Sequence, residues 1–203
     1  IAIVSEVSDE DRRLFLTPEE LEWLASIRSD RKRMDSAAAR IAAKIIAMKL
    51  GLGGAPLECQ IVRSNVAPVL HVNGAPSGLT VSLSHSEGIG AGGIFEGPAG
   101  IDLQLVRPVN PRTAKFFLAE DEVPMLSREH ALLHLWCAKE AAWKASAAPG
   151  STLTSVCLRL VDESDLAVRF SYEVAGSIGI VETRFCELDL LLAVASATSL
   201  PSS

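Results

Sequence analysis

The sequence is poor in aromatic residues and in positive charge. Only 5% of its 203 residues are Phe, Trp or Tyr, while 48% are hydrophobic, so a core must be built mainly from Leu, Ile, Val and Ala. With 19 Lys and Arg against 25 Asp and Glu, the formal net charge is -6. This balance argues against general nucleic-acid binding, which requires a basic surface.

Long apolar runs and paired cysteines are also missing. The apolar run at residues 188–197 is too short to cross a bilayer and predicts a buried strand. The four cysteines, at positions 59, 137, 157 and 186, show no CxxC spacing, which favours reduced thiols in a cytoplasmic protein. No signal peptide is visible, and because the chain begins with Ile1 we expect residues before it. We therefore expect a cytoplasmic protein without a membrane partner.

Two segments carry charged side chains that could meet in space. Residues 100–104 predict a strand, in which Asp102 faces the side opposite to its apolar neighbours. Residues 136–144 predict a helix, on which Glu140 and Lys144 share a face because they are four positions apart. If this strand and helix pack together, two carboxylates and an ammonium converge, which suits Mg²⁺ and a phosphate. A solvated strand aspartate and a surface Lys–Glu pair are the alternatives.

A third motif lies upstream. Residues 81–86 predict a strand that contains Ser84-His85-Ser86 and runs into a glycine-rich turn and a second strand. Such a cluster beside open glycine backbone can donate several hydrogen bonds to an anion. A histidine with satisfied hydrogen bonds at a strand end is the alternative.

Together the three motifs resemble the 4'-phosphopantetheinyl transferases, specifically the two-lobed Sfp-type branch. The family pattern is a Ser-His-Ser strand, then Gly-Ile-Asp-x-Glu, then Trp-x-x-Lys-Glu-x-x-x-Lys. These elements correspond in order and spacing to residues 84–86, 100–104 and 136–144. The resemblance spans nearly the whole chain.

The resemblance implies a Mg²⁺-dependent holo-acyl-carrier-protein synthase. Such an enzyme transfers the phosphopantetheine arm of coenzyme A to a serine of an apo acyl, peptidyl or polyketide carrier protein and releases adenosine 3',5'-bisphosphate. It implies the metal ligands Asp102, Gln104 and Glu140 and the catalytic residues Glu122, Glu140 and Lys144. The second strand carboxylate of the family is Gln104 here, so we expect weaker Mg²⁺ binding.

The resemblance also implies contacts with coenzyme A and with the carrier. The residues expected to bind coenzyme A are Arg28, Arg40, Ser84, His85, Lys139 and Lys144. The lysine that the family places before the Ser-His-Ser strand is Ala67 here. We expect carrier specificity on an apolar surface around residues 116–118. The sequence does not name the carrier or its pathway, which could be fatty acid, polyketide or nonribosomal peptide biosynthesis.

The chain contains a degenerate two-fold repeat. One helical region opens at residues 15–21, with Thr17 as N-cap, and ends near Gly51; another opens at residues 117–123 and ends near Gly150. Strand-like segments follow at 58–64, 79–84, 91–95, 100–106, 156–161, 167–172, 177–185 and 190–195.

This pattern predicts an α+β fold of two similar pseudo-two-fold lobes, each a helix packed on a small antiparallel sheet, as in the 4'-phosphopantetheinyl transferase fold. We place the lobes at residues 1–98, on the coenzyme A 3'-phosphate side, and 99–203, which carries the metal ligands. In the repeat Ile45 stands where the second helix has Glu140. We therefore expect no metal site in the first lobe, one active site between the lobes, and a monomer.

Two other functions fit the sequence less well. One is a catalytically degenerate module that binds coenzyme A or a carrier protein, which Gln104 and Ala67 would favour. The other is an unrelated Mg²⁺-dependent nucleotide enzyme, although no Walker-type glycine-lysine loop is present.

Overall fold

The computed structural model describes residues 1–64, 66–119, 122, 129–187 and 189–198. The chain divides into two compact units, Ile1–Gly97 and Pro98–Ser203. Each unit contains helices and one antiparallel five-stranded sheet, so the predicted α+β class with a sheet in each half is confirmed. Among the helices that the structure describes, none has the length and apolar character needed to span a membrane.

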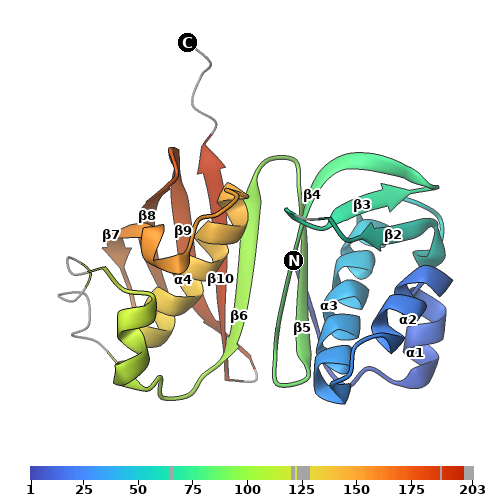
Figure 1. The fold of residues 1–203 in the computed structure, drawn as a ribbon, viewed down its shortest axis with the longest axis horizontal. Helices are drawn as coiled ribbons and strands as arrows, with labels where there is room; N and C mark the ends of the chain where they lie inside the picture. The colour runs from blue at the N-terminus through green and yellow to red at the C-terminus, as the bar shows by residue number, and fades with distance from the viewer. Residues whose placement is uncertain (65, 120–121, 123–128, 188, 199–203) are drawn as a thin grey trace, which may run out of the picture. The chain divides into compact units, whose positions relative to one another are not determined.

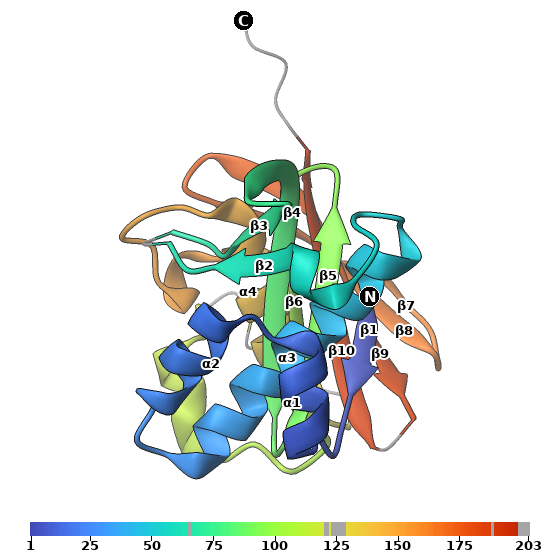
Figure 2. The same ribbon diagram turned by 90° about the vertical axis from the view of Figure 1, so that its right-hand side faces the viewer.

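The first unit is a sheet covered on one face by helices. Its elements are β1 (Ala2–Val4), α1 (Asp9–Phe15), α2 (Pro18–Ala25), α3 (Asp30–Lys49), a short 3-10 turn (Pro56–Glu58), β2 (Cys59–Val62), β3 (Val69–Val72), β4 (Ala75–Ser86) and β5 (Ile89–Phe95). The strand order is β1-β5-β4-β3-β2. Helix α3 packs against β5, while α1 and α2 lie on its far side (Figures 1 and 2). The long helix is therefore enclosed between two apolar layers.

Local sequence explains where the helices of this unit begin. The Thr17 N–H donates to Glu20 Oε2 at 3.0 Å and the Glu20 N–H to the Thr17 hydroxyl at 3.4 Å, which forms a capping box and confirms Thr17 as the N-cap. The helical region is not continuous to Gly51, however. It breaks after Ala25, and Ser29 caps the new helix α3 by accepting the Lys32 N–H at 3.3 Å.

The second unit repeats this plan. Its elements are β6 (Ala99–Leu105), a 3-10 helix (Pro111–Phe116), α4 (Ala131–Ser146), a 3-10 turn (Leu153–Ser155), β7 (Cys157–Glu163), β8 (Ala167–Val174), β9 (Ser177–Cys186) and β10 (Leu190–Thr198). The strand order, β6-β10-β9-β8-β7, matches that of the first unit: the first strand pairs with the last, and the others run back in reverse. The repeat seen in the sequence therefore extends to the connectivity of the two sheets. Strands β1 and β3, only three and four residues long, are the two that the sequence did not predict.

The core of the second unit is aliphatic, as the composition predicts. Small residues of α4 pack on the sheet with Leu191, Ala193 and Ala195 of β10 and Val181 of β9. The aromatic residues in this core are Phe117, Phe170 and Tyr172, and the ring of Phe117 meets that of Trp136 at 4.9 Å in an edge-to-face contact.

Candidate functional site

The strand β6 and the helix α4 bring the predicted charged residues together. Lys144 Nζ lies 2.9 Å from Asp102 Oδ1 and 3.6 Å from Glu140 Oε2, and it donates to the Ile101 carbonyl oxygen at 3.0 Å. Asp102 is 1% exposed, and the side chains of Glu140 and Lys144 are 25% and 23% exposed. The predicted convergence of two carboxylates and one ammonium is therefore present, at a place that solvent partly reaches.

Gly100 explains how closely the helix approaches the strand. A Cβ at this position would overlap the Ala141 carbonyl oxygen and lie 2.6 Å from the Ala145 nitrogen. The two backbones are thus in direct contact two residues before Asp102. The same close backbone contact occurs in the first unit, where a Cβ at Gly90 or Gly92 of β5 would overlap the backbone of α3.

Gly100→Ala is therefore expected to push α4 away from β6 and to separate Asp102 from Lys144. We expect a loss of roughly 1–3 kcal/mol in the free energy of unfolding, because no side chain can relax around a backbone clash. Denaturant unfolding measures this loss. The matched control is Gly97→Ala, since a Cβ there has open space around it, and its stability should change by less than about 0.5 kcal/mol. Equal stability of the two variants would contradict the close packing.

The charges of this cluster perturb one another. Burial first, and then the nearby Asp102 carboxylate, raise the pKa of Glu140 to about 7, although Lys144 opposes the shift. Burial alone would lower the pKa of Lys144, but Asp102 and Glu140 outweigh it and raise the pKa above its usual value. Lys144 therefore stays charged at neutral pH, while Glu140 carries a proton about half of the time unless another cation joins the cluster.

The residues present fit a hard cation such as Mg²⁺. Two carboxylates and the amide of Gln104 gather at one place, and such oxygen donors are what Mg²⁺ prefers. The Gln104 Nε2 donates to Asp102 Oδ2 at 2.9 Å, so the amide lies beside the carboxylate as predicted. Within the described ranges, no group of three or more His, Cys, Asp or Glu side chains is placed to hold a metal ion. Asp102 and Glu140 could thus hold the ion only with help from Gln104, water or a ligand.

Two residues predicted to act in the site are instead buried in an ion pair. Lys139 and Glu122 are both 0% exposed, and Lys139 Nζ lies 2.6 Å from Glu122 Oε2. Lys139 also donates to the Val156 carbonyl oxygen at 2.6 Å, and Glu122 Oε1 accepts the Leu158 N–H at 2.9 Å. Neither side chain reaches solvent, so this burial does not favour the contact of Lys139 with coenzyme A, which stays a prediction. The catalytic role implied for Glu122 likewise stays a prediction that this burial does not favour.

The basic residues predicted to bind a phosphate differ in exposure. Arg28 is exposed after α2. Arg40 is 5% exposed, with its guanidinium 3.9 Å from the centre of the Trp23 ring and its Nε 3.9 Å from Glu20 Oε1. Burial lowers the pKa of Arg40 to about 10, against the effect of Glu20. Arg40 is therefore largely committed to contacts within the first unit, and the exposed Arg28 is the better candidate for an anion.

The Ser-His-Ser motif lies on β4, where side chains alternate between faces. Ser84 is buried, whereas the side chain of His85 is 44% exposed. His85 Nδ1 lies 3.6 Å from the buried carboxylate of Asp35 on α3, whose Oδ1 accepts the Gly88 N–H at 2.7 Å. Sequence reasoning missed Asp35, because a contact across 53 positions leaves no local pattern.

The surface predicted to recognise the carrier is only partly exposed. Phe116 is 69% exposed, Phe117 is 0% exposed and Leu118 is packed against the core. Residue 117 therefore belongs to the core of the second unit and cannot contact a carrier directly. Of the three side chains, that of Phe116 is the most exposed, and that of Leu118 is partly buried.

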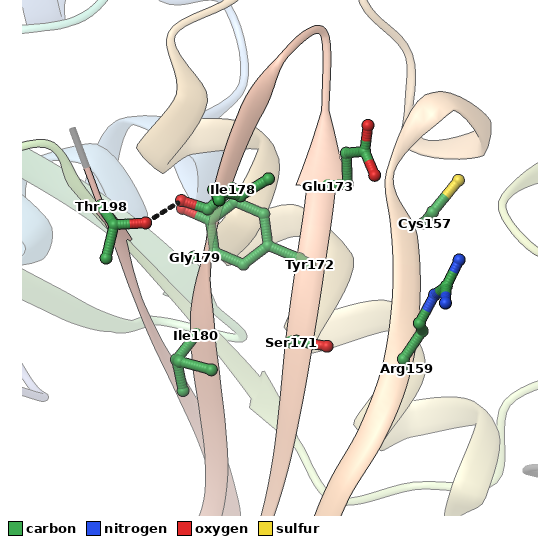
Figure 3. A pocket seen from close by; sticks show the side chains of 9 residues that line it. All are labelled: Cys157, Arg159, Ser171, Tyr172, Glu173, Ile178, Gly179, Ile180 and Thr198. Carbon is green, nitrogen blue, oxygen red and sulfur yellow. Dashed lines mark hydrogen bonds between the residues drawn. The ribbon is translucent and has the colours of Figure 1, made fainter. Parts of the chain in front are cut away.

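A shallow groove lies on the second unit, on the sheet face opposite to α4 (Figure 3). Its lining includes the side chains of Arg159, Glu173, Ile178 and Ile180. These residues occupy outward-facing positions on the neighbouring strands β7, β8 and β9. None of Asp102, Glu140 and Lys144 lines the groove, so it is separate from the charged cluster.

Comparison with known proteins does not place the chain in a family. No protein-family model matches the sequence, and no curated protein matches it either.

Proposed function

We propose that the protein is a 4'-phosphopantetheinyl transferase of the two-lobed type. The observation that carries this proposal is the convergence of Asp102, Glu140 and Lys144 where β6 meets α4. The matching strand orders of the two units support the same proposal, since a duplicated lobe is what the resemblance implies.

The proposed reaction moves the phosphopantetheine arm of coenzyme A to a serine of an apo carrier protein. The serine oxygen forms a bond to the β-phosphorus of coenzyme A, the bond from that phosphorus to the bridging oxygen breaks, and adenosine 3',5'-bisphosphate leaves. The serine proton is released. Phosphoryl transfer of this kind is catalysed mainly by positioning and by neutralising charge.

The residues of the cluster have distinct roles in this proposal. Asp102 and Glu140 would hold Mg²⁺, which supplies charge neutralisation for the pyrophosphate. Lys144 keeps its proton because the carboxylates raise its pKa, so it offers a permanent positive charge to a phosphate oxygen. Gln104 holds Asp102 Oδ2 at 2.9 Å and thereby fixes the rotation of that carboxylate.

Intact mass of apo carrier proteins after incubation with this protein, coenzyme A and Mg²⁺ tests the proposal. The panel should include fatty-acid, polyketide and peptide-synthetase carriers. We expect a gain of one phosphopantetheine, which is lost without Mg²⁺ and lost when the target serine is replaced by alanine. Binding of coenzyme A without transfer to any carrier would instead support a degenerate binding module.

Gln104→Glu is expected to tighten Mg²⁺ binding. A third carboxylate adds negative charge beside Asp102, and the Mg²⁺ dissociation constant should fall by roughly tenfold. Calorimetric titration measures it. The Gln60→Glu substitution at a half-buried position in the first unit is a control with the same change of charge, and a similar effect of both variants would show that only net charge matters.

A further inference from the structure

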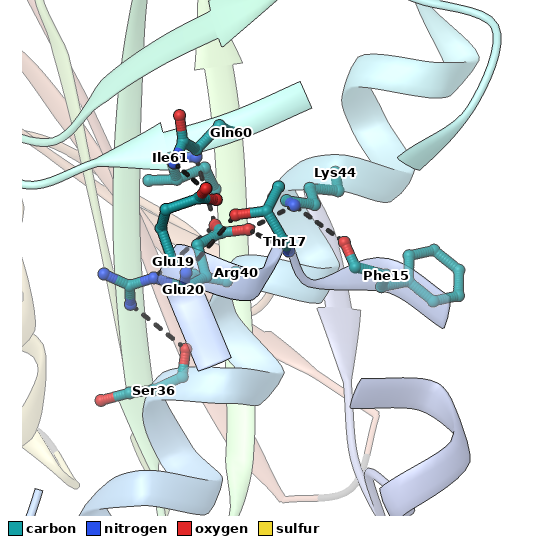
Figure 4. Close-up of polar contacts among 9 residues, drawn as sticks. All are labelled: Phe15, Thr17, Glu19, Glu20, Ser36, Arg40, Lys44, Gln60 and Ile61. Atoms are coloured by element: carbon teal, nitrogen blue, oxygen red, sulfur yellow. Dashed lines mark hydrogen bonds and ion pairs between the residues drawn. The ribbon is translucent and has the colours of Figure 1, made fainter. Parts of the chain in front are cut away.

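Each unit contains a buried ion pair built to the same plan. In the first unit Lys44 Nζ lies 2.5 Å from Glu20 Oε2, with side chains 0% and 3% exposed. Glu20 also accepts the Thr17 N–H at 3.0 Å and the Ile61 N–H of β2 at 3.1 Å (Figure 4). Lys44 donates to the Phe15 carbonyl oxygen at 2.8 Å. The pair thus joins the start of α2, the middle of α3 and the first strand after α3.

The second unit repeats the contacts of the carboxylate and the ion pair, while its lysine donates to a carbonyl oxygen after the helix instead of before it. Glu122 accepts the Ala119 N–H, three positions earlier, at 2.7 Å and the Leu158 N–H of β7 at 2.9 Å. Lys139 of α4 lies 2.6 Å from Glu122 Oε2 and donates to the Val156 carbonyl oxygen at 2.6 Å. Here too a carboxylate joins the segment before the helix to the first strand after it, and a lysine of the helix completes the junction.

The two junctions differ in the residue that follows the lysine. In the first unit Lys44 is followed by Ile45, which packs against the apolar cluster around Leu16 and Leu24. In the second unit Lys139 is followed by Glu140, whose carboxylate lies in the charged cluster with Lys144. Only the second pair therefore adjoins a residue that we propose for metal binding.

Consecutive residues of a helix cannot turn independently of each other. A helix with side chains has a radius of about 6 Å, so a rotation of roughly 10° about its axis moves a carboxylate by about 1 Å. Lys139 is fixed on one side of α4 by Glu122 and by two carbonyl oxygens, those of Leu153 and Val156. These contacts, together with the packing of α4 on β6 at Gly100, restrict the rotation of α4 and hence the position of Glu140 relative to Asp102.

Stability alone does not explain a buried ion pair at this point. Removing two charges from water costs about as much as their attraction returns, and apolar residues of similar volume are often as stable or more stable. What such a pair adds is one defined geometry, because each of its hydrogen bonds has a fixed direction.

We infer that Glu122 and Lys139 are positioning residues for Glu140 and hold it in the geometry that binds Mg²⁺. This inference rests on the proposed metal site of the second unit. It replaces the direct catalytic and coenzyme A-binding roles that the resemblance implies for these two residues.

The test compares the double variant E122Q/K139M with the matched double variant E20Q/K44M in the full chain. Both remove a buried ion pair. E122Q/K139M neutralises both partners of its pair, whereas E20Q/K44M also removes the carboxylate 3.9 Å from the buried Arg40, so the folding of this control must be verified. We expect the Mg²⁺ dissociation constant, measured by calorimetric titration, to rise roughly 10–100-fold in E122Q/K139M and to stay unchanged in E20Q/K44M. Thermal unfolding of both variants shows whether a loss of stability accompanies the loss of affinity.

Several results would overturn the inference. Unchanged Mg²⁺ affinity in E122Q/K139M would show that the pair does not position Glu140, and equal weakening in both variants would show a general loosening of the protein. If E122Q/K139M does not fold, Lys139→Arg keeps the charge but changes its reach, and unchanged Mg²⁺ affinity in that variant would overturn the inference.

Failure of the wild-type protein to bind Mg²⁺ would reject the metal site together with the inference. Wild-type Mg²⁺ binding without transfer to any carrier would reject only the transferase, and the comparison of the variants would still decide the positioning role.

Discussion

Replacing Glu140 by glutamine is expected to lower the rate of carrier modification by at least about 100-fold. The substitution removes one of the two carboxylates that face Lys144, and with it half of the negative charge available to Mg²⁺. The fold should remain, because glutamine has the same shape and burial already favours the neutral form of Glu140, whose pKa is raised to about 7. The initial rate of phosphopantetheine transfer, followed by mass, measures the effect.

Glu22→Gln is the control for this experiment, since Glu22 is an exposed glutamate on the helix α2. It should transfer at the wild-type rate. Asp102→Asn should lose as much activity as Glu140→Gln, because the two carboxylates flank the same ammonium. A Glu140→Gln protein that keeps more than a third of the wild-type rate would reject the proposed metal site.

The affinity for Mg²⁺ is expected to fall steeply below pH 7. The pKa of Glu140 is raised to about 7, so the cation must displace a proton from this carboxylate at lower pH. For one such group the affinity falls about fivefold from pH 7 to pH 6 and about tenfold more from pH 6 to pH 5. Calorimetric titration at the three pH values measures it. An affinity that does not change over this range would show that Glu140 is not a ligand.

The same shift has a consequence for the metal-free protein. The pKa of Glu140 is higher in the folded protein, about 7, than its ordinary value of 4.5. The stability that the protonated form contributes is therefore fully present below about pH 4.5 and is lost as the pH rises through about 7. In EDTA, the loss of stability that comes from ionisation of Glu140 at rising pH should be absent from Glu140→Gln. At pH 8, Mg²⁺ should restore the lost stability only in the wild-type protein. Thermal unfolding at pH 5, 7 and 8 measures both effects.

The internal repeat was predicted from the sequence only in part. The corresponding positions of the two helices were predicted from the sequence, including the correspondence of Ile45 with Glu140. That both units share one strand order became visible only in the sheets, because the short strands β1 and β3, of three and four residues, were not predicted from the sequence.

The burial of charged side chains is the property that the sequence predicted least well. Glu122, Lys139 and Arg40 were expected to face ligands, and the structure buries all three. Nothing local distinguishes Lys139 from Lys144, although the first is fully buried against Glu122 and the second is partly exposed beside Asp102. Whether a charge meets solvent depends on which distant segment packs over it.

The sequence by itself determined the cluster of Asp102, Glu140 and Lys144. The alternation of a strand places Asp102 on one face, the spacing of four on a helix unites Glu140 with Lys144, and both rules are local. Only the tertiary structure decided that Gly100 brings the strand and helix into contact and that Lys139 is bound to Glu122. Those outcomes depend on backbone approach and on contacts between distant segments, which no periodicity of the sequence records.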